Sequence, residues 1–311
     1  MFFPVLSWNF YCGGFFFMTQ ATSGMEGLDA FYFLSNDFNS LSASGLLRRL
    51  AATPFDLTAP AALSPERIAQ YRADAAGFTL LYATQRLDDA VLDGLQQLAD
   101  QGAVVEQFRL MRQGAVLNRI AGFASEERQV LHTACRDVFR PEPDAPEATA
   151  EARAELGKLK IFLEELAAGA LVNVKGQSFT DMVQIGIGGS DLGPRALSLA
   201  LAAYGLPGRR VHFISNVDPD DAAAVLAGLD LSRTIINVVS KSGTTLETLT
   251  NEELVRRAYA EAGLDPLRHF VAVTGKGSPM DDPAHYLRSF YMFDYIGGRY
   301  SATSMVGAVT L

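Results

Sequence analysis

The second half of the chain alternates between short apolar runs and stretches with the apolar spacing of helices. The apolar runs lie at residues 182–187, 211–214, 234–239 and 270–273. The helical stretches between them include residues 219–228 and 245–262. Strands rich in β-branched residues that alternate with helices are typical of a parallel sheet covered by helices on both faces. The pattern therefore predicts an α/β fold for this part of the chain.

Helical spacing dominates the first half. The Ser-Pro-Glu sequence at residues 64–66 predicts a helix start, because a capping hydroxyl precedes a proline at the first helical position. Apolar positions over residues 91–98 lie on one helical face, and Gly102 ends that helix. Another helix is expected to begin at residues 125–128. The first half is thus predicted to be helical.

Prolines mark the boundary between the two halves. They are concentrated within residues 141–146, and a segment rich in Ala, Glu and Leu follows over residues 148–170. Proline interrupts regular structure, whereas the second composition is typical of a long helix. We therefore expect a helical N-terminal region over residues 26–145 and a sheet domain over residues 146–311.

The first eighteen residues are rich in aromatic side chains and contain no Lys or Arg. A secretory signal begins with a basic region, and a membrane-surface anchor presents a cationic face. Pro4, Asn9 and a pair of glycines interrupt the run, which argues against a transmembrane helix. We expect residues 1–25 to be an extension outside the fold, with a membrane-surface anchor as the alternative.

Composition narrows the classes of function. The 311 residues carry 26 Lys and Arg against 35 Asp and Glu, a net charge of −9, without the basic cluster that a nucleic-acid binder uses. Two cysteines are too few for a disulfide framework, so we expect free thiols in a reducing compartment, the cytoplasm. The histidines lack the spacing of a zinc site. We therefore expect no metal and no nucleic-acid partner.

Residues 186–194 form a glycine-rich segment, here named the glycine loop, directly after the first predicted strand. Glycine lets the backbone turn sharply and approach a ligand closely. The last glycine of a dinucleotide-binding GxGxxG fingerprint would fall at position 191, which is Asp191, so a nicotinamide-dependent dehydrogenase is disfavoured. The alternative to a ligand site is a tight strand-to-helix turn.

Residues 240–245, here named the hydroxyl loop, leave a buried-type strand and enter a helix with the sequence Ser-Lys-Ser-Gly-Thr-Thr. Hydroxyl groups and the free N–H groups of a helix N-terminus are good phosphate ligands. The alternative is that Thr244 caps the helix and Glu247 completes a capping box. The cap accounts for two residues and leaves the other hydroxyls unexplained.

Residues 297–301, here named the arginine motif, have the sequence Gly-Gly-Arg-Tyr-Ser. An arginine behind two glycines can project into a cleft as a fixed cation. The alternative is a surface turn.

Together, residues 180–194, 240–248 and 297–304 resemble the glucose-6-phosphate isomerase family in order and spacing. The similarity extends upstream to residues 54–86 and 130–133, which resemble the divergent bacterial branch of that family, so it covers about residues 40–311. The resemblance implies a three-layer sugar-isomerase (SIS) domain with a five-stranded parallel sheet, preceded by a helical region. It also implies an isomerase of glycolysis and gluconeogenesis that acts without a cofactor.

The resemblance assigns the phosphate of the sugar to the hydroxyl loop. Ser240, Ser242 and Thr245 would hold the phosphate, with Lys241 and Thr244 in the same loop. Many family members have Thr and Phe where this chain has Ser and Gly at positions 242 and 243. The form found here is closer to a general phosphosugar-binding loop, so phosphate binding is expected and the sugar specificity is left open.

The resemblance also assigns the reacting end of the sugar. Gly189 and Ser190 would line the sugar, and Arg299 would face its C1–C2 end. Glu247 matches a family acid that orients the ring-opening histidine, so its catalytic and capping interpretations both stay open. The expected reaction interconverts glucose 6-phosphate and fructose 6-phosphate through a cis-enediol.

The family places its catalytic carboxylate, its ring-opening histidine and a late lysine well downstream of the arginine motif. This chain ends on an apolar run at residues 304–311, which is typical of a sequence cut within a domain. We therefore expect a first sugar-isomerase domain that does not catalyse as it stands. A non-catalytic phosphosugar-binding module is the alternative. The family also implies a homodimer and no membrane partner.

Overall fold

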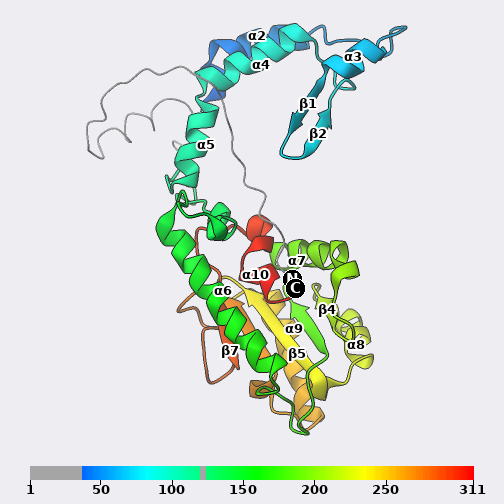
Figure 1. The fold of residues 1–311 in the computed structure, drawn as a ribbon, viewed down its shortest axis with the longest axis vertical. Coiled ribbons are helices and arrows are strands. Elements are labelled where there is room, and N and C mark those ends of the chain that lie inside the picture. The colour runs from blue at the N-terminus through cyan, green and yellow to red at the C-terminus, as the bar shows by residue number, and fades with distance from the viewer. Residues whose placement is uncertain (1–36, 120–123) are drawn as a thin grey trace, which may run out of the picture. The chain divides into compact units, whose positions relative to one another are not determined.

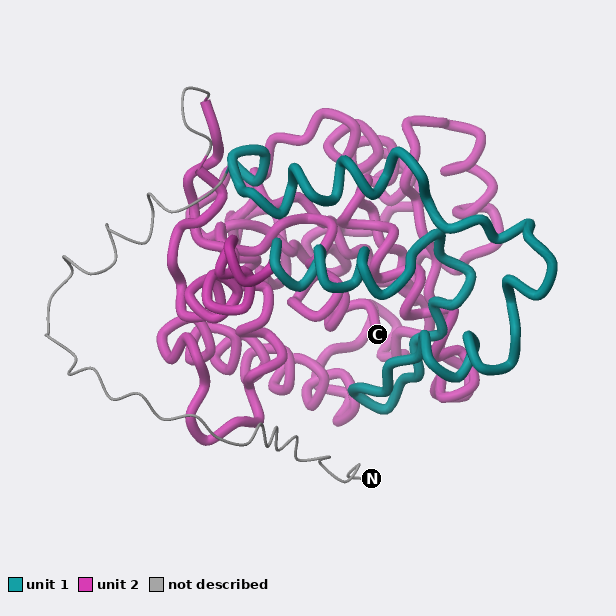
Figure 2. The backbone as a smooth tube through the Cα atoms, turned by 90° about the horizontal axis from the view of Figure 1, so that it is seen from above, with its two compact units in different colours: residues 1–98 teal, residues 99–311 magenta. Residues whose placement is uncertain are grey.

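The computed structural model describes residues 37–119 and 124–311. The expected extension over residues 1–25 lies outside these residues. Contacts within the chain define two compact units, residues 1–98 and 99–311, and each is described by itself (Figure 2). The domain boundary that the sequence suggests near residue 145 stays a prediction.

The first unit consists of short helices and one hairpin. Its elements are η1 (Phe38–Ser40), α2 (Ser42–Ala51), α3 (Pro65–Gln70), β1 (Arg72–Ala75), β2 (Phe78–Leu81) and the start of α4 (Asp89–Gln101). The predicted start of α3 is confirmed, since the Ser64 hydroxyl accepts a hydrogen bond from the Arg67 amide at 3.3 Å. The antiparallel hairpin of β1 and β2 is an addition that the helical prediction for this region did not contain.

A buried arginine organises the loop after the hairpin. The Arg67 guanidinium donates hydrogen bonds to the carbonyls of Ala83, Gln85 and Leu87. It also lies over the ring of Phe55, 3.9 Å from the ring centroid. These contacts satisfy backbone oxygens that no regular element pairs.

The second unit contains the sheet domain (Figure 1). Its helices are α5 (Val104–Arg112), α6 (Pro146–Ala167), α7 (Gly189–Ala200), α8 (Pro219–Ala227), α9 (Leu246–Glu261) and α10 (Met305–Ala308). Its strands are β3 (Asp181–Ile185), β4 (Arg210–Ile214), β5 (Thr234–Ser240), β6 (Phe270–Thr274) and β7 (Arg288–Tyr291). Short 3-10 turns complete it: η2 (His132–Cys135), η3 (Asp137–Phe139), η4 (Ala202–Tyr204), η5 (Leu231–Arg233), η6 (Pro266–Arg268) and η7 (Gly298–Thr303).

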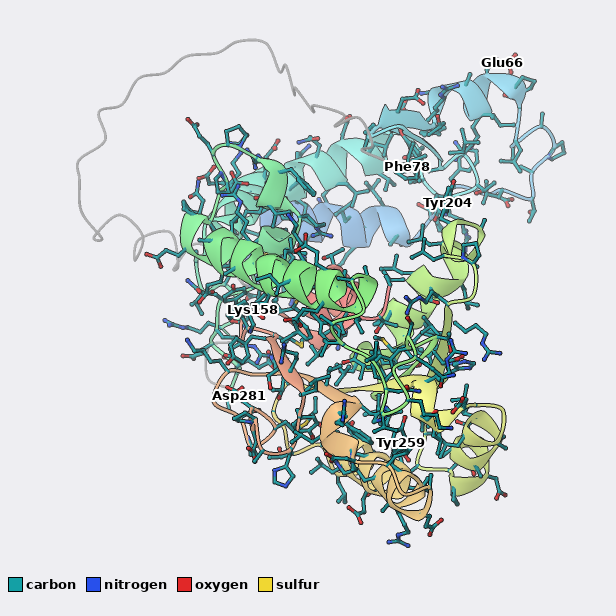
Figure 3. The ribbon with its side chains drawn as sticks, turned by 60° about the horizontal axis from the view of Figure 1, so that its bottom comes forward. Glu66, Phe78, Lys158, Tyr204, Tyr259 and Asp281 are labelled. Atoms are coloured by element: carbon teal, nitrogen blue, oxygen red, sulfur yellow. The ribbon has the colours of Figure 1, made fainter. Side chains whose placement is uncertain are left out.

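The five strands are all parallel, in the order β4-β3-β5-β6-β7. Alternate side chains of the strands face two different apolar layers. On one face, strand residues such as Ile235 and Val273 pack against Phe162 of α6 and Val306 of α10. On the other, the strands pack against α8 and α9, where Tyr259 is fully buried. Lys158 and Tyr259, labelled in Figure 3, mark α6 and α9 of the two helical layers. The three-layer α/β fold is therefore confirmed.

The helix expected to begin at residues 125–128 is not formed, and that prediction was wrong. Residues 124–131 are irregular and lead into η2. Glu127 has a positive φ of 44°, which a helix cannot contain. The amide of Arg128 instead bonds the Asn118 side chain, and the amide of Leu131 bonds the Tyr295 carbonyl. Tertiary hydrogen bonds here replace the helical ones.

No helix in residues 37–119 and 124–311 combines the length and the apolar character needed to cross a membrane.

Candidate functional site

The order of the strands places two of the predicted loops at one point of the sheet. The chain moves from β3 to β4 on one side and from β5 to β6 on the other. The glycine loop follows the carboxyl end of β3, and the chain then continues towards β4. The hydroxyl loop follows the carboxyl end of the adjacent strand β5, and the chain then continues towards β6 on the other side. In parallel sheets this reversal of strand order forms a crevice beyond the carboxyl ends of the strands, where ligands bind.

The glycine loop turns tightly into α7. Gly188 has a φ of +59°, a conformation that favours glycine. A Cβ added to Gly186 would lie 2.8 Å from the Cβ of Ser190, so only glycine lets the start of α7 fold back over the end of β3. Asp191 is buried and pairs with Arg195 at 2.7 Å. Ser190 is half-buried at the mouth of this turn.

The arginine motif lies against the glycine loop. A Cβ added to Gly189 would lie 2.2 Å from the carbonyl carbon of Gly298, so the two backbones are in direct contact. The Ser301 hydroxyl donates to the carbonyl of Gly189 at 3.2 Å and to that of Gly298 at 2.8 Å. Arg299 is exposed, and its guanidinium has no ion pair among the residues that the structure describes. The motif thus places Arg299 directly after the Gly298 backbone that contacts Gly189.

The hydroxyl loop is held by its own side chains. Ser240 is 2% exposed, and its hydroxyl lies 2.9 Å from the hydroxyl of Thr245. The Thr244 hydroxyl and amide both donate to the Ser242 hydroxyl, at 3.0 and 3.2 Å. Gly243 between them has a φ of +67°. The five predicted phosphate residues, Lys241 included, are therefore gathered in one compact turn.

The capping interpretation of Thr244 and Glu247 was wrong. The N-cap residue of α9 is Thr245, and its side chain makes no capping hydrogen bond. The Thr244 hydroxyl is directed to Ser242 instead, and Glu247 is exposed without a hydrogen-bond partner in the described part of the chain. The catalytic interpretation of Glu247 stays a prediction.

The uncapped start of α9 has the properties of an anion site. The first N–H groups of a helix have no intrahelical acceptor and carry partial positive charge. Thr248, in the first turn, is 1% exposed, and its hydroxyl has no hydrogen-bond partner within residues 37–119 and 124–311. A phosphate above this turn would accept hydrogen bonds from the helix amides and from the adjacent hydroxyl loop.

Lys241 connects the hydroxyl loop to the segment before the arginine motif. Its ammonium donates to the carbonyls of Asp294 and Ile296 at 3.1 and 3.3 Å. It also lies 3.5 Å from the Asp294 carboxylate. The ammonium therefore positions the arginine motif as well as adding positive charge near the hydroxyl loop.

The loop at residues 275–287, here named the supporting loop, packs against the hydroxyl loop. A Cβ on Gly243 would lie 2.9 Å from the Ser278 hydroxyl and 3.0 Å from the Met280 amide nitrogen. The Thr274 hydroxyl donates to the Ser240 carbonyl at 2.7 Å, and it lies 2.7 Å from the Ser278 hydroxyl. These contacts fix the position of the glycine at the tip of the turn.

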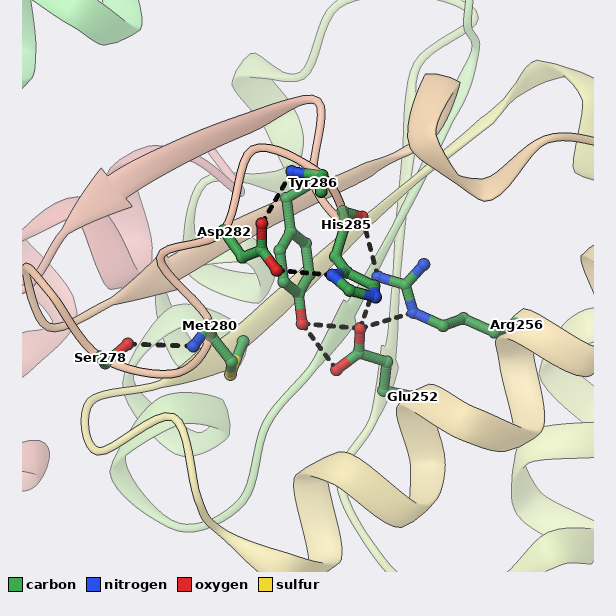
Figure 4. Close-up of polar contacts among 8 residues, drawn as sticks. Glu252, Arg256, Ser278, Met280, Asp282, His285 and Tyr286 are labelled. Carbon is green, nitrogen blue, oxygen red and sulfur yellow. Dashed lines mark hydrogen bonds and ion pairs between the residues drawn. The ribbon is translucent and has the colours of Figure 1, made fainter.

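A buried ion pair anchors this supporting loop to α9 (Figure 4). The Tyr286 hydroxyl donates to both carboxylate oxygens of Glu252, at 2.7 and 2.8 Å. Arg256 donates to the same carboxylate at 2.8 Å and to the carbonyl of His285 at 3.1 Å. Burial, together with the adjacent Glu252 charge, raises the pKa of Tyr286. The tyrosine therefore stays protonated and able to donate.

The residues before η3 contribute contacts that the motifs did not reveal. The ring of His132 stacks on that of Tyr300, next to Arg299, with centroids 4.5 Å apart. Arg128 pairs with Asp294 at 3.2 Å. Burial, with a smaller effect of Arg136, lowers the pKa of His132. The similarity at residues 130–133 was the one sequence signal for this contact.

Two buried amides inside the sheet were also missed. Gln184 on β3 and Asn237 on β5 are adjacent in register and at most 1% exposed. Their signal in the sequence is a polar residue inside each apolar run. Among the described residues, no group of His, Cys, Asp and Glu side chains is arranged to hold a metal ion.

Known proteins resemble this chain over most of its length. The family model for phosphoglucose isomerase matches residues 81–311. A glucose-6-phosphate isomerase of Desulfotalea psychrophila is 57% identical over 266 residues, which are 85% of this chain and 50% of the relative. One of Protochlamydia amoebophila is 52% identical over 278 residues, covering 88% of this chain and 50% of the relative.

A solved structure agrees with the fold. The crystal structure of a glucose-6-phosphate isomerase from Chlamydia trachomatis matches with a TM-score of 0.79 and 48% sequence identity, covering 88% of this chain and 52% of that one. This chain spans about half the length of the curated relatives it matches. It belongs to the phosphoglucose isomerase family.

Proposed function

We propose that this chain carries the phosphosugar-binding part of a glucose-6-phosphate isomerase and binds glucose 6-phosphate and fructose 6-phosphate. The observation that supports this most is the meeting of three separate motifs at one edge of the sheet, beside the uncapped start of α9. An uncapped helix start lined with hydroxyls suits a phosphate monoester.

In this proposal the hydroxyl loop holds the phosphate. Ser240, Ser242 and Thr245 supply hydroxyl groups, and the amides at the start of α9 supply the partial positive charge. Lys241 and Thr244 stabilise the loop, because their polar groups are already engaged with the Asp294 segment and with Ser242. Gly189 and Ser190 line the sugar.

Arg299 is the proposed electrostatic catalyst. Moving a proton between C2 and C1 produces an enediolate, whose negative charge a fixed cation stabilises. The exposed guanidinium beside Gly298 is free to take this role. Removing a preorganised charge of this kind lowers kcat by about 10²–10³ in enzymes generally.

The described loops contain no carboxylate that is both unpaired and assigned as a general base. Asp191 is paired with Arg195, and Asp294 lies beside both Lys241 and Arg128. Both carboxylates are therefore already engaged by cations and are not directed at a substrate. Glu247 remains, which the family resemblance gives an orienting role. We therefore propose that the 311 residues bind the sugar phosphate without turning it over.

A homodimer and a cytoplasmic location are part of the same proposal. The homodimer rests on the family resemblance, and the cytoplasmic location rests on a composition with two cysteines. Light scattering of the purified chain tests the oligomeric state.

Thermal unfolding with and without glucose 6-phosphate tests the binding. The melting temperature should rise with ligand concentration, since binding to the folded state stabilises it. Ser242→Asp should abolish the rise through charge repulsion, while Ser125→Asp, outside the three motifs, should retain it. A parent without a shift, or an S242D variant with an unchanged shift, would contradict the proposal.

A coupled isomerase assay separates binding from catalysis. Binding without turnover is the expected result for the 311-residue polypeptide. Turnover near that of a full-length relative would place the base within this chain, with Glu247→Gln as the first variant to examine.

A further inference from the structure

Gln184 and Asn237 are polar residues inside a sheet that is buried on both faces. Parallel strands of this kind are normally continuous apolar runs, and a buried amide lowers stability unless its groups are hydrogen-bonded. Both side chains point to the layer that contains α10, since they alternate with residues that face α8 and α9. A specific hydrogen-bonding task would account for them.

The hydrogen bond that Gln184 makes is explained by the sequence of α7, the helix that begins at the glycine loop. In α7 the carbonyl of Ser190 would bond the N–H of residue 194, but residue 194 is proline and has no N–H. The Gln184 side-chain amide donates to this carbonyl at 2.5 Å. Gly186 makes the approach possible, because a Cβ there would lie 3.0 Å from the same oxygen.

Asn237 holds Gln184 in this orientation. Its side-chain NH₂ donates to the Gln184 side-chain oxygen at 3.2 Å and to the Thr310 hydroxyl at 3.3 Å. With its oxygen occupied, Gln184 is left to present its own NH₂ to Ser190. The Asn237 oxygen has no partner among the described residues, so the arrangement is not one of maximal stability.

The two amides therefore link the candidate binding loops. Asn237 belongs to β5, which ends at Ser240 of the hydroxyl loop, and Gln184 belongs to β3, which ends at the glycine loop. We infer that Gln184, oriented by Asn237, positions Gly189 and Ser190 for the sugar relative to the phosphate. This inference rests on the proposed function and adds two positioning residues to it.

The substitution Gln184→Met tests the inference, because methionine has a similar shape and no N–H donor. Pro194→Ala is the rescue, since it restores an N–H that can bond the Ser190 carbonyl within α7. Tyr259→Phe is the matched control. It removes a buried hydrogen bond of 3.0 Å to the Thr234 carbonyl, at the opposite end of β5.

Calorimetry with two ligands separates positioning from general loss of structure. Gln184→Met should weaken glucose 6-phosphate binding about tenfold and inorganic phosphate binding less than about twofold. In the Pro194→Ala background the same substitution should weaken glucose 6-phosphate binding by no more than about threefold. Tyr259→Phe should leave the ratio of the two affinities unchanged. Equal weakening of both ligands, or no rescue, would overturn the inference.

Amide hydrogen exchange measured without ligand tests the inference independently of the proposed function. Gln184→Met should speed amide exchange in residues 186–193, and Pro194→Ala should reverse this. If the parent binds neither ligand, the proposed function fails, while the exchange still shows whether Gln184 orders the loop. Unchanged exchange in Gln184→Met, or in Asn237→Leu for the orienting role, would refute the inference.

Discussion

Gly189 and Gly298 are in backbone contact, although they belong to motifs that lie far apart in the sequence. A Cβ on Gly189 would lie 2.2 Å from both the carbonyl carbon and the carbonyl oxygen of Gly298. Neither carbonyl can move aside easily, because the Ser301 hydroxyl bonds both residues. The glycine at 189 thus sets the distance between the glycine loop and the arginine motif.

Gly189→Ala should separate the two motifs. We expect the free energy of unfolding to fall by about 1–3 kcal/mol, as for other overpacked positions, and glucose 6-phosphate binding to weaken. Urea unfolding and calorimetry measure the two effects. Gly297→Ala is the control, since a Cβ there meets nothing within 4 Å. Equal behaviour of the two variants would mean that the close contact is not required.

The fold could be predicted where burial is complete. Strand β5 is buried at every position, so its sequence is an apolar run, interrupted only by Asn237 between residues 235 and 239, that is easily recognised. Strand β7 lies at the sheet edge and combines an exposed arginine with a buried phenylalanine, so its four residues carry no clear pattern. Every residue of the β1–β2 hairpin is exposed, including the apolar Phe78, Leu80 and Leu81 of β2, so no alternation of buried and exposed positions identifies these strands.

The positions of the candidate loops could be predicted from local composition, whereas their roles stay predictions. Glycines and hydroxyls identify the glycine loop and the hydroxyl loop, because turn geometry and phosphate binding need these residue types. The capping error has a physical origin: Thr244 and Thr245 are chemically equivalent, and only the backbone decides which one begins α9. The contacts of Lys241 depend on carbonyls far away in the sequence, and the contact of Gln184 depends on how the nearby glycine loop folds back over β3.

Lys241→Met should loosen the arginine motif. The substitution removes the donor to the Asp294 and Ile296 carbonyls, so we expect glucose 6-phosphate affinity to fall about tenfold. Lys241→Arg, which can still donate to both carbonyls, should recover part of it. Calorimetry at several salt concentrations provides the measurement. If Met and Arg variants bind equally, the lysine acts without its hydrogen bonds.

Asp181 should make stability depend on pH. Burial acts to raise its pKa, but hydrogen bonds from Arg210, His212 and Thr180 together outweigh burial and hold the pKa below its usual value. A carboxylate with a lowered pKa stabilises the fold above its unfolded pKa, about 3.9. That contribution is lost as the pH falls through the lower folded value.

The variant Asp181→Asn isolates this contribution. At pH 7 we expect it to lower the free energy of unfolding by about 1–3 kcal/mol, because Arg210, His212 and Thr180 lose a buried, charged acceptor. Below about pH 4 the difference from the parent should shrink. Chemical unfolding from pH 3 to 7 gives the curve, and exposed Glu253→Gln serves as control. A difference that is constant with pH would contradict the role of the charge.

Cys135 should react slowly with thiol reagents. Burial raises the pKa of its thiol to about 11, and the thiolate is the reactive form. With Cys12 replaced by Ser, labelling of the folded chain at pH 7.5 should be slower by more than about a hundredfold than labelling in urea. Absorbance of the released chromophore follows the reaction. Comparable rates in the two conditions would show that the thiol is accessible and ionised.

Tyr286→Phe should weaken the support behind the hydroxyl loop. It leaves the Glu252 carboxylate, only 5% exposed, with Arg256 as its remaining partner, so we expect a loss of about 1–3 kcal/mol in unfolding free energy. The loop at residues 275–287 should also exchange its amides faster. Because this loop contacts Gly243, the affinity for inorganic phosphate should fall in parallel.

Tyr291→Phe supplies the matched control for that experiment. Its hydroxyl is partly exposed and donates to Asp281 at 3.3 Å, so its loss should change stability by less than about 0.5 kcal/mol. Urea unfolding, hydrogen exchange and phosphate calorimetry on both variants complete the comparison. A Tyr286→Phe variant that loses stability but keeps its phosphate affinity would confine the ion pair to a structural role. Loss of both, with Tyr291→Phe unchanged, is expected if the ion pair on α9 holds the hydroxyl loop in its binding conformation.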